Sequence, residues 1–374
     1  MPGRAKHHKS LTEGDSRAKD EKGELLGEGS FGCVFRPPVK CTANVKPISN
    51  TAAKEAQKKK VSGSAKHKPA VGKVFFDHRD FTKEVKMAKV VAKIDPVGKN
   101  ILVPTSSCES TREEVLNHPA GSSCEKQSEL PYMSLTAPVY QLTMPYGGMR
   151  LDHYVADHKL SPKQFLHIMV PVIEGVAMMD KKGFCHQDIK TLNLLVTPSK
   201  EGIIIDYSLM LPYEQIYSEA NRRRWKFSYF PYPPEYKMFY FLSRKMPVPE
   251  EKLLTEVKKN WFSFGDGRGK AYFDLFGKRM IQKAIHSFYS YAVKQGVTGA
   301  KLEETFAPLA AKLDLYSVGM IFVDINRSLH FTGYGKRSTW MRNYMHLIRT
   351  MCHPDPRERG APAEILEMAK ALLD

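Results

Sequence analysis

One short polar segment and one strand end carry the residue types that chemistry on a phosphate requires. Residues 186–193 read His-Gln-Asp-Ile-Lys-Thr-Leu-Asn, and Asp206 follows an apolar run. Phosphoryl transfer needs a carboxylate beside the attacking hydroxyl, a cation on the moving phosphoryl group and hard oxygen ligands for Mg²⁺. Asp188, Lys190 and Asn193 can supply these groups together with Asp206, so we expect phosphoryl-transfer chemistry here.

A glycine cluster near the start of the chain could supply the contact with phosphate. Gly27, Gly29 and Gly32 follow the spacing G-x-G-x-x-G, and glycine lets backbone N–H groups approach a phosphate closely. A dinucleotide-binding turn would be followed at once by a helix, whereas residues 33–35 continue as a strand. The pattern therefore favours a phosphate-covering hairpin. Taken alone, an ordinary flexible turn explains it equally well.

Composition limits the class of protein. The chain has 374 residues, 42% of them hydrophobic, which is enough for one large core or two smaller ones. A net charge of +17 favours polyanionic ligands: nucleotides, acidic protein segments or non-specific nucleic-acid contact through basic loops. Basic loops that only keep the protein in solution are the alternative.

The cysteines and the apolar runs bear on cellular location. The six cysteines lack paired metal-ligand spacing, so zinc is not expected. The polar start of the chain does not resemble an export signal, and reduced thiols inside a cell are therefore expected. No apolar run is long enough to span a membrane. We expect an intracellular protein, in the cytoplasm or nucleus, without membrane contact.

The elements that must position these groups divide the chain into two parts. Strand patterns dominate the first part and helical patterns the second, which indicates an α+β architecture with segregated lobes. The expected segments are a polar tail at 1–22, a first lobe at 23–145 with a Lys-rich insertion at 40–69 and a loop insertion at 105–137, and a second lobe at 146–374 with a helical insertion at about 237–312. The alternative for the Lys-rich insertion is an anion-binding or nuclear-targeting run.

Local patterns predict individual elements. Ala70–Phe76 predicts a strand, and Asp80 is expected to cap the helix that follows it. Ser161 followed by Pro162 predicts a helix start, because a capping hydroxyl precedes proline in the first turn. The apolar residues at 315–325 predict a buried helix.

With these motifs in order, the sequence resembles the eukaryotic-type protein kinase family from about Leu25 to the C-terminus. The motifs that carry the resemblance are Gly27–Val34, Lys73, His186–Asn193, Asp206–Ser208, Pro233–Glu235, Asp314–Gly319 and Asp355–Arg359. The resemblance implies a bilobal fold with a small β-rich N-lobe and a larger α-helical C-lobe. It also implies transfer of the γ-phosphoryl group of ATP to protein substrates with Mg²⁺. Lysine-rich insertions and drifted motifs further resemble kinases of large double-stranded DNA viruses, which would place the chain in a host cell or virion.

The resemblance assigns catalytic roles by position. Asp188 is expected to be the catalytic base, and Lys190 to neutralise the transferred phosphoryl group. Asn193 and Asp206 are expected to hold Mg²⁺. A lysine at position 190 is typical of the serine/threonine kinases of the family rather than the tyrosine kinases.

The resemblance also implies how ATP is held. Lys73 is expected to contact the α- and β-phosphates and to pair with Glu84, for which a solvated helical glutamate is the alternative. Met144 would be the gatekeeper, and the Gly147 N–H the donor to adenine. The implied ATP-binding residues are Gly27, Gly29, Gly32, Val34, Val71, Lys73, Met144, Gly147 and Leu195. The resemblance further implies that Asp314 braces the catalytic loop and that Arg359 pairs with Glu235.

Several positions depart from the family's pattern. Gln187 replaces the arginine that receives an activation-loop phosphate, so activity without such phosphorylation is expected. Ser208 replaces a glycine, which reduces backbone freedom beside Asp206. Residues 222–224 are arginines that could bind acidic substrate flanks, with a solvated loop as the alternative. The insertion at about 237–312 could bind substrate or only elaborate the packing.

Three other functions fit parts of the sequence. A pseudokinase or scaffold would bind nucleotide and an acidic partner, but the presence of Lys73, Asp188 and Asp206 favours an active enzyme. A small-molecule kinase shares the ATP cleft, yet the elements around Glu235 and Arg359 argue for protein substrates. A basic nucleic-acid-binding protein would need a recognition module, and we find none in the sequence.

Overall fold

A computed structural model describes most of the chain. The described residues are 23–29, 32–48, 69–124, 133–216, 232–233, 235–236, 268–294, 300–329 and 338–374. The predicted tail at 1–22, most of the Lys-rich insertion, the arginines at 222–224 and the part of the long insertion at 237–267 lie outside these residues. The chain divides into two compact units. The first contains the chain up to Val97 together with Val103–Tyr146, and the second contains Gly98–Leu102 and Gly147–Asp374.

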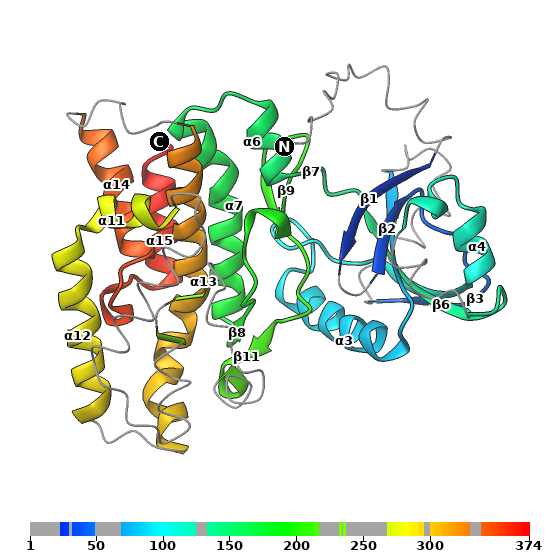
Figure 1. The fold of residues 1–374 in the computed structure, drawn as a ribbon, viewed down its shortest axis with the longest axis horizontal. Helices are drawn as coiled ribbons and strands as arrows, with labels where there is room; N and C mark the ends of the chain where they lie inside the picture. Colours follow the sequence, from blue (N-terminus) through cyan, green and yellow to red (C-terminus); the bar gives the residue numbers. More distant parts are fainter. Residues whose placement is uncertain are drawn as a thin grey trace, which may run out of the picture. The chain divides into compact units, whose positions relative to one another are not determined.

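The first unit is built on one antiparallel six-stranded sheet (Figure 1). Its strands are β1 (Glu24–Gly29), β2 (Gly32–Arg36), β3 (Ala43–Pro47), β4 (Ala70–Phe75), β5 (Ser106–Thr111) and β6 (Pro138–Pro145), in the spatial order β1-β2-β4-β6-β5-β3. In the central strands β4 and β6 consecutive residues are buried, as expected where both faces of a sheet are covered. Phe35, Val74 and Val139 are fully buried in one cluster.

The prediction that residues 105–137 form a loop insertion is wrong in its first half. Strand β5 pairs with β6 along its whole length, and it is followed by helix α4 (Arg112–Asn117) and the short 3₁₀ helix η2 (Gly121–Ser123). Val115 and Ala120 from this segment join the buried cluster. The Lys-rich insertion likewise contains β3, which pairs with β5 at the edge of the sheet. Both strands are rich in polar residues and show no apolar pattern typical of a strand. Hydrogen bonds between backbones, and not the side chains, place these two strands in the sheet.

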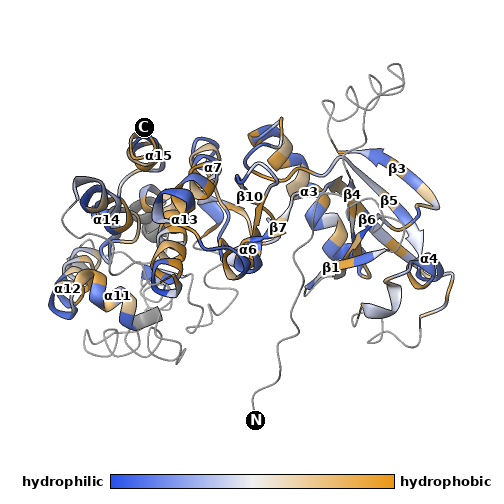
Figure 2. Cartoon of the chain, turned by 90° about the horizontal axis from the view of Figure 1, so that it is seen from above, coloured by the Kyte–Doolittle hydropathy of each residue, from blue (hydrophilic) through white to orange (hydrophobic). Residues whose placement is uncertain are grey.

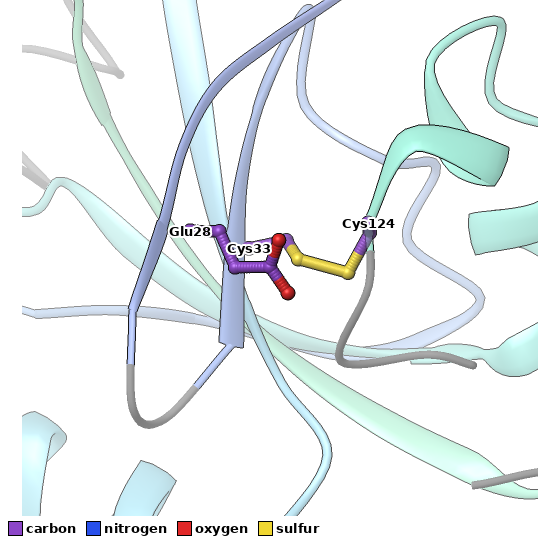
Figure 3. Close-up of side chains that lie close together, drawn as sticks. All are labelled: Glu28, Cys33 and Cys124. Atoms are coloured by element: carbon purple, nitrogen blue, oxygen red, sulfur yellow. A yellow bond between two sulfur atoms is a disulfide. The ribbon is translucent and has the colours of Figure 1, made fainter. Parts of the chain in front are cut away.

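The prediction of reduced thiols is wrong for four of the six cysteines. Cys33 on β2 forms a disulfide with Cys124 after η2, and Cys41 forms one with Cys108 on β5. Figure 3 shows the first disulfide beside Glu28 of β1. The partners lie 91 and 67 residues apart in sequence, so only the folded sheet brings them together. Cys185 and Cys352 are free and buried.

Helix α3 (His78–Ile94) packs against the sheet of the first unit. It begins earlier than predicted: its cap is Asp77, whose carboxylate accepts the N–H groups of Arg79 and Asp80, so the predicted cap lies in the first turn. The Phe81 ring stacks on Tyr140 of β6 with centroids 5.1 Å apart, which fixes the helix to the sheet. Ala88 and Glu84 lie on the buried face of α3.

The second unit is mainly helical. Its helices are α6 (Leu151–Asp157), α7 (Pro162–Asp180), α11 (Arg268–Phe276), α12 (Lys278–Lys294), α13 (Ala300–Ser328), α14 (Thr339–Met351) and α15 (Pro362–Ala371), with the 3₁₀ helices η3 (Thr191–Asn193), η4 (Tyr213–Gln215) and η6 (Pro356–Glu358). Its short strands are β7 (Met149–Arg150), β8 (Phe184–Cys185), β9 (Leu194–Val196), β10 (Gly202–Ile204) and β11 (Leu211–Pro212). Figure 2 shows apolar and polar residues on the same helices, as in α14. Helix α14 buries one face, which contains Met341, Tyr344 and Leu347.

Helices α7 and α13 form the centre of this unit. Ser161 caps α7 through a capping box with Gln164, and Pro162 occupies the first turn, which confirms the predicted helix start. The predicted buried helix at 315–325 lies within α13, and its apolar side chains are almost completely buried. Phe165 of α7 meets Phe322 of α13 edge-to-face at 5.0 Å.

The described part of the long insertion is helical and packs into the second unit. Tyr272 of α11 is fully buried, and its hydroxyl donates to the carbonyl of Cys352 at 2.8 Å. Arg349 of α14 donates to the carbonyl of Leu275. Helix α11 therefore belongs to the core of the unit. Among the described helices, none combines the length and apolar character needed to cross a membrane.

Candidate active site

The glycine cluster forms a hairpin between β1 and β2, as predicted. Gly27 pairs with Val34 and Gly29 with Gly32, and the two residues at the tip lie outside the described part. Gly32 must be glycine: its φ is +154°, and a Cβ there would lie 1.8 Å from the carbonyl oxygen of Val74. Nothing lies within 4 Å of where a Cβ of Gly27 or Gly29 would be. The hairpin backbone therefore has open space beside it.

Lys73 and Glu84 form the predicted ion pair. Lys73 lies in β4, and its Nζ is 2.7 Å from Oε1 of Glu84 on α3. The lysine side chain is 16% exposed and the glutamate side chain 5%. This burial excludes the alternative of a solvated helical glutamate. The pair can therefore hold the ammonium group in one position on the sheet.

Four of the predicted ATP-binding residues lie on neighbouring strands of the first unit. Val34 of β2 is opposite Lys73 of β4, and Val71 of β4 is opposite Met144 of β6. In the second unit, Gly147 packs directly on Leu195 of β9, where a Cβ on the glycine would come within 2.7 Å of the leucine side chain. Each unit thus brings its own members of the predicted set together.

The catalytic-loop residues meet around one carboxylate in the second unit. Lys190 Nζ lies 3.1 and 3.0 Å from the two carboxylate oxygens of Asp188. The side-chain amide of Asn193 donates to Asp188 Oδ2 at 2.7 Å and to its carbonyl at 2.9 Å. Asp188 is only 7% exposed. A carboxylate held in this way by a cation and an amide can orient a hydroxyl and accept its proton.

Asp206 is tied to the same loop through the backbone. The N–H of Ile205, one residue before it, donates to the carbonyl of Asn193 at 3.0 Å. A ring nitrogen of His186 lies 3.2 Å from the carbonyl oxygen of Ile205. Asp206 itself has a φ of +60°, a left-handed conformation that is uncommon for a residue other than glycine. Such a conformation is held only where the surroundings determine it.

The donor set suits a hard divalent cation. Both hydrogen bonds of the Asn193 amide nitrogen go to Asp188, so its amide oxygen is directed away from that residue. A carboxylate and an amide oxygen are ligands that Mg²⁺ accepts, whereas zinc prefers sulfur and imidazole. The residues expected to hold Mg²⁺ therefore fit it by chemical type.

Asp314 of α13 holds the backbone of the catalytic loop through hydrogen bonds. Its two carboxylate oxygens accept the backbone N–H groups of His186 at 2.6 Å and Gln187 at 2.9 Å, as the resemblance implied. The side chain is almost completely buried. Burial raises the pKa of Asp314, while His186 and these hydrogen bonds act in the opposite direction. Gln187 has a φ of +63° and donates from its side chain to the carbonyl of Leu209 at 3.1 Å.

A second buried ion pair joins Arg359 and Glu235. The guanidinium binds both carboxylate oxygens, with Nη2 2.9 Å from Oε2, and neither side chain is exposed. Burial alone would lower the pKa of Arg359, but the charge of Glu235 and its hydrogen bonds raise it. The predicted pair is therefore present, with the bidentate geometry that only arginine can provide.

Sequence reasoning missed the surroundings of the glycine hairpin. The carboxylate of Glu28 lies within 4.8 Å of the sulfur atoms of Cys33 and Cys124 (Figure 3). The hairpin strand β2 is thus linked covalently to the segment after α4. No spacing in the sequence indicated this link, because the two cysteines are far apart along the chain.

Comparison with known proteins gives two findings. A family model described as protein tyrosine and serine/threonine kinase matches residues 21–246, which is more than half of the chain. The match includes the glycine hairpin, Lys73, the catalytic loop and Asp206. A "Probable CTD kinase subunit alpha homolog" of Encephalitozoon cuniculi (strain GB-M1) is 25% identical over 68 residues. That similarity covers 18% of this chain and 21% of the relative, so the chain spans about a fifth of the relative's length.

Proposed function

The chain belongs to the protein tyrosine and serine/threonine kinase family, and we propose that it is an active serine/threonine kinase. It transfers the γ-phosphoryl group of ATP to serine or threonine hydroxyls of protein substrates. The single observation that carries the proposal is the geometry around Asp188, whose carboxylate is held by both Lys190 and Asn193. A scaffold that only binds nucleotide would have no need of this arrangement.

Asp188 is the general base in this proposal. Its carboxylate orients the substrate hydroxyl and takes its proton as the oxygen attacks phosphorus. Lys190, which contacts the same carboxylate, lies close enough to neutralise charge on the phosphoryl group during transfer. Asn193 keeps the carboxylate in position through its hydrogen bond to Oδ2. Asp314 holds the backbone of this loop, so the three side chains keep their places.

Asp206 and Asn193 are the proposed Mg²⁺ ligands. Bound Mg²⁺ supplies positive charge that offsets the charge of the phosphate oxygens. The contribution of this chain is to hold the two oxygen donors through the backbone bond between Ile205 and Asn193. Removal of the divalent cation with EDTA should therefore abolish transfer.

Lys73 is the proposed contact with the nucleotide phosphates. Glu84 keeps its ammonium group oriented, since their side chains are 2.7 Å apart and mostly buried. The backbone of the glycine hairpin, with open space at Gly27 and Gly29, covers the phosphates. Val34, Val71, Met144, Gly147 and Leu195 form the proposed surroundings of the adenine ring.

The preference for serine and threonine rests on Lys190. The family model covers kinases of both specificities, and within the family a lysine at this position is typical of the serine/threonine group. The two specificities are distinguished by phosphoamino-acid analysis of the labelled product. Phosphotyrosine as the only product would contradict this part of the proposal.

A transfer assay with the full chain tests the proposal. Purified protein is incubated with radiolabelled ATP, Mg²⁺ and generic acidic or basic acceptor proteins. Asp188→Asn should reduce labelling by about 10²-fold or more, because general-base catalysis contributes that much. Equal labelling by both proteins would mean that the activity is a contaminant. A thermal shift with Mg-ATP but no labelling by wild type would leave the scaffold as the better function.

A further inference from the structure

A pocket of about 550 Å³ lies in the second unit, and none of the residues proposed above for catalysis lines it. We call it the α6–α7 pocket. Its walls come from α6, the segment between α6 and α7, the first half of α7, the turn between β9 and β10, and Leu373. Figure 1 labels the two helices that give the pocket its name. The site therefore combines segments that are far apart in sequence.

The rim of the pocket is positively charged. Lys159, Lys163 and Lys200 line it and are exposed. Asp157 is the one acidic residue among those that line the pocket. Within the described part of the chain, no ion pair involves any of the three lysines. Three uncompensated cations around one hollow attract an anionic partner, in a chain whose net charge is +17.

The turn that carries Lys200 is closed by hydrogen bonds. Lys200 has a φ of +64°, a left-handed conformation that disfavours residues other than glycine, asparagine and aspartate. Its N–H donates to the carbonyl of Thr197 at 2.9 Å, and the Thr197 hydroxyl accepts the N–H of Glu201 at 3.1 Å. These bonds determine where the lysine side chain leaves the backbone. The turn thus places Lys200 at the pocket that it lines.

The interior of the pocket is apolar. Ile168 is buried, and Leu160 and Leu373 are half-buried. Tyr154 and His158 stack on each other with ring centroids 4.1 Å apart, so each covers one face of the other. An aliphatic side chain of a ligand needs only an apolar floor of this kind. Together with the three lysines, the floor matches a peptide that carries both an apolar side chain and acidic residues.

We propose that the α6–α7 pocket is a docking site for an acidic segment of a partner protein, with an apolar side chain of that segment in the pocket. Glutamates or aspartates of the segment pair with Lys159, Lys163 and Lys200, and the apolar side chain packs on Ile168 and its neighbours. The proposal concerns binding alone. It does not depend on the phosphotransfer proposed above, and its test needs no ATP.

The expected strength follows from the two kinds of contact. An exposed ion pair contributes up to about fivefold in affinity, and burial of one leucine side chain contributes about tenfold or more. Reversing two rim charges removes attractive pairs and adds repulsion, so we expect binding to weaken by about tenfold or more. Because the pairs are exposed, binding should also weaken as salt is raised.

Fluorescence anisotropy with the full chain tests the site. The probe is a short fluorescein-labelled peptide with two leucines flanked by glutamates. The variant Lys159→Glu/Lys163→Glu should bind it about tenfold or more weakly than wild type. The matched control is Lys278→Glu/Lys283→Glu, which changes the same charge at exposed positions of α12 in the same unit. It should bind like wild type. Peptides with serine for leucine, or glutamine for glutamate, should both bind more weakly.

The opposite results would overturn the proposal. Absence of peptide binding by wild type, or an equal loss in both double variants, would mean no site or only non-specific attraction. Equal binding of the serine peptide and the leucine peptide would show that no apolar side chain of the peptide packs on Ile168. Tighter binding by a short uridine oligonucleotide, lost in Lys159→Glu/Lys163→Glu, would make the site a nucleic-acid site. Displacement of the peptide by millimolar inorganic phosphate alone would reduce it to an anion site. Unchanged thermal unfolding of both variants excludes misfolding as the cause.

Discussion

Removal of the disulfide between Cys33 and Cys124 should destabilise the first unit without touching any proposed catalytic group. The disulfide joins β2, the second strand of the glycine hairpin, to the segment after η2. Both cysteines belong to the buried cluster of this unit. The perturbation is Cys33→Ser/Cys124→Ser, which keeps the side-chain size close and removes the covalent link.

The magnitude follows from the length of chain that the bond closes. For a sequence separation of 91 residues, the chain-entropy relation predicts about 4 to 5 kcal/mol at 25 °C. The Cys41–Cys108 disulfide lies within this loop and already restricts the denatured chain. We therefore expect a loss of about 2 to 3 kcal/mol, within the usual range for a native disulfide. That is a large share of the stability of a domain.

Hydrogen exchange measured by mass spectrometry on the full chain reports each unit separately. In the double variant, amides of β2 and β4 should exchange about 30- to 150-fold faster, which is the same free energy expressed as an opening constant. Amides of α7 and α13 in the second unit should keep their protection. The matched control is Cys185→Ser/Cys352→Ser, which removes the two free cysteines of the second unit. It should leave the exchange of β2 and β4 unchanged.

Alkylation tests whether the two disulfides are formed in the protein. In denaturant without reductant, iodoacetamide should modify only Cys185 and Cys352 of the six cysteines. Modification of all six would show that no covalent link contributes to the first unit. Unchanged exchange in the Cys33→Ser/Cys124→Ser variant would refute the magnitude.

Three further perturbations test other contacts. Arg359→Lys should cost about 3 to 5 kcal/mol, because it leaves the buried Glu235 without its bidentate partner; an unchanged midpoint in urea would contradict this. Burial lowers the pKa of His118, so its contribution to stability is present above about pH 6.5 and is lost as pH falls through the lower folded pKa. His118→Gln should flatten the thermal stability profile between neutral and mildly acidic pH, and an identical profile would exclude this histidine. Gln187 is uncharged and stands where the family has an arginine that binds a phosphate, and its side chain donates to the carbonyl of Leu209 instead. Phosphatase treatment should therefore leave transfer activity unchanged, and loss of activity would show dependence on a phosphate.

Some features could be predicted from the sequence because they are local. Asp188, Lys190 and Asn193 lie within one short loop, so the chain itself brings their side chains together. The pair of Lys73 and Glu84, which the family resemblance implied, joins a strand to the helix that follows it, and this limits how far apart the two can be. The cap at Ser161 needs only the next three residues. In each case the partners are close in sequence, and little chain entropy opposes the contact.

Other features were predicted only through the family resemblance. Asp314 lies well over a hundred residues after the backbone groups that it binds, and no pattern of residue types connects them. The same is true of Arg359 and Glu235. Their contacts follow from α13 and the C-terminal elements packing in one core. The order of the motifs indicated both contacts, but they form only because distant segments pack in one core.

The disulfides, strand β5 and the α6–α7 pocket were decided by tertiary structure alone. Strand β5 is rich in serine and has no apolar alternation strong enough to predict it, because its hydrogen bonds to β3 and β6 supply its order. Cys33 and Cys124 meet only when the sheet has formed. Lys163 and Lys200 line one pocket because α7 packs against β10, which follows the β9–β10 turn. The sequence by itself determines which chemical groups are present and which residues close along the chain come into contact. The packing of distant segments determines the disulfides, the edge of the sheet and the α6–α7 pocket.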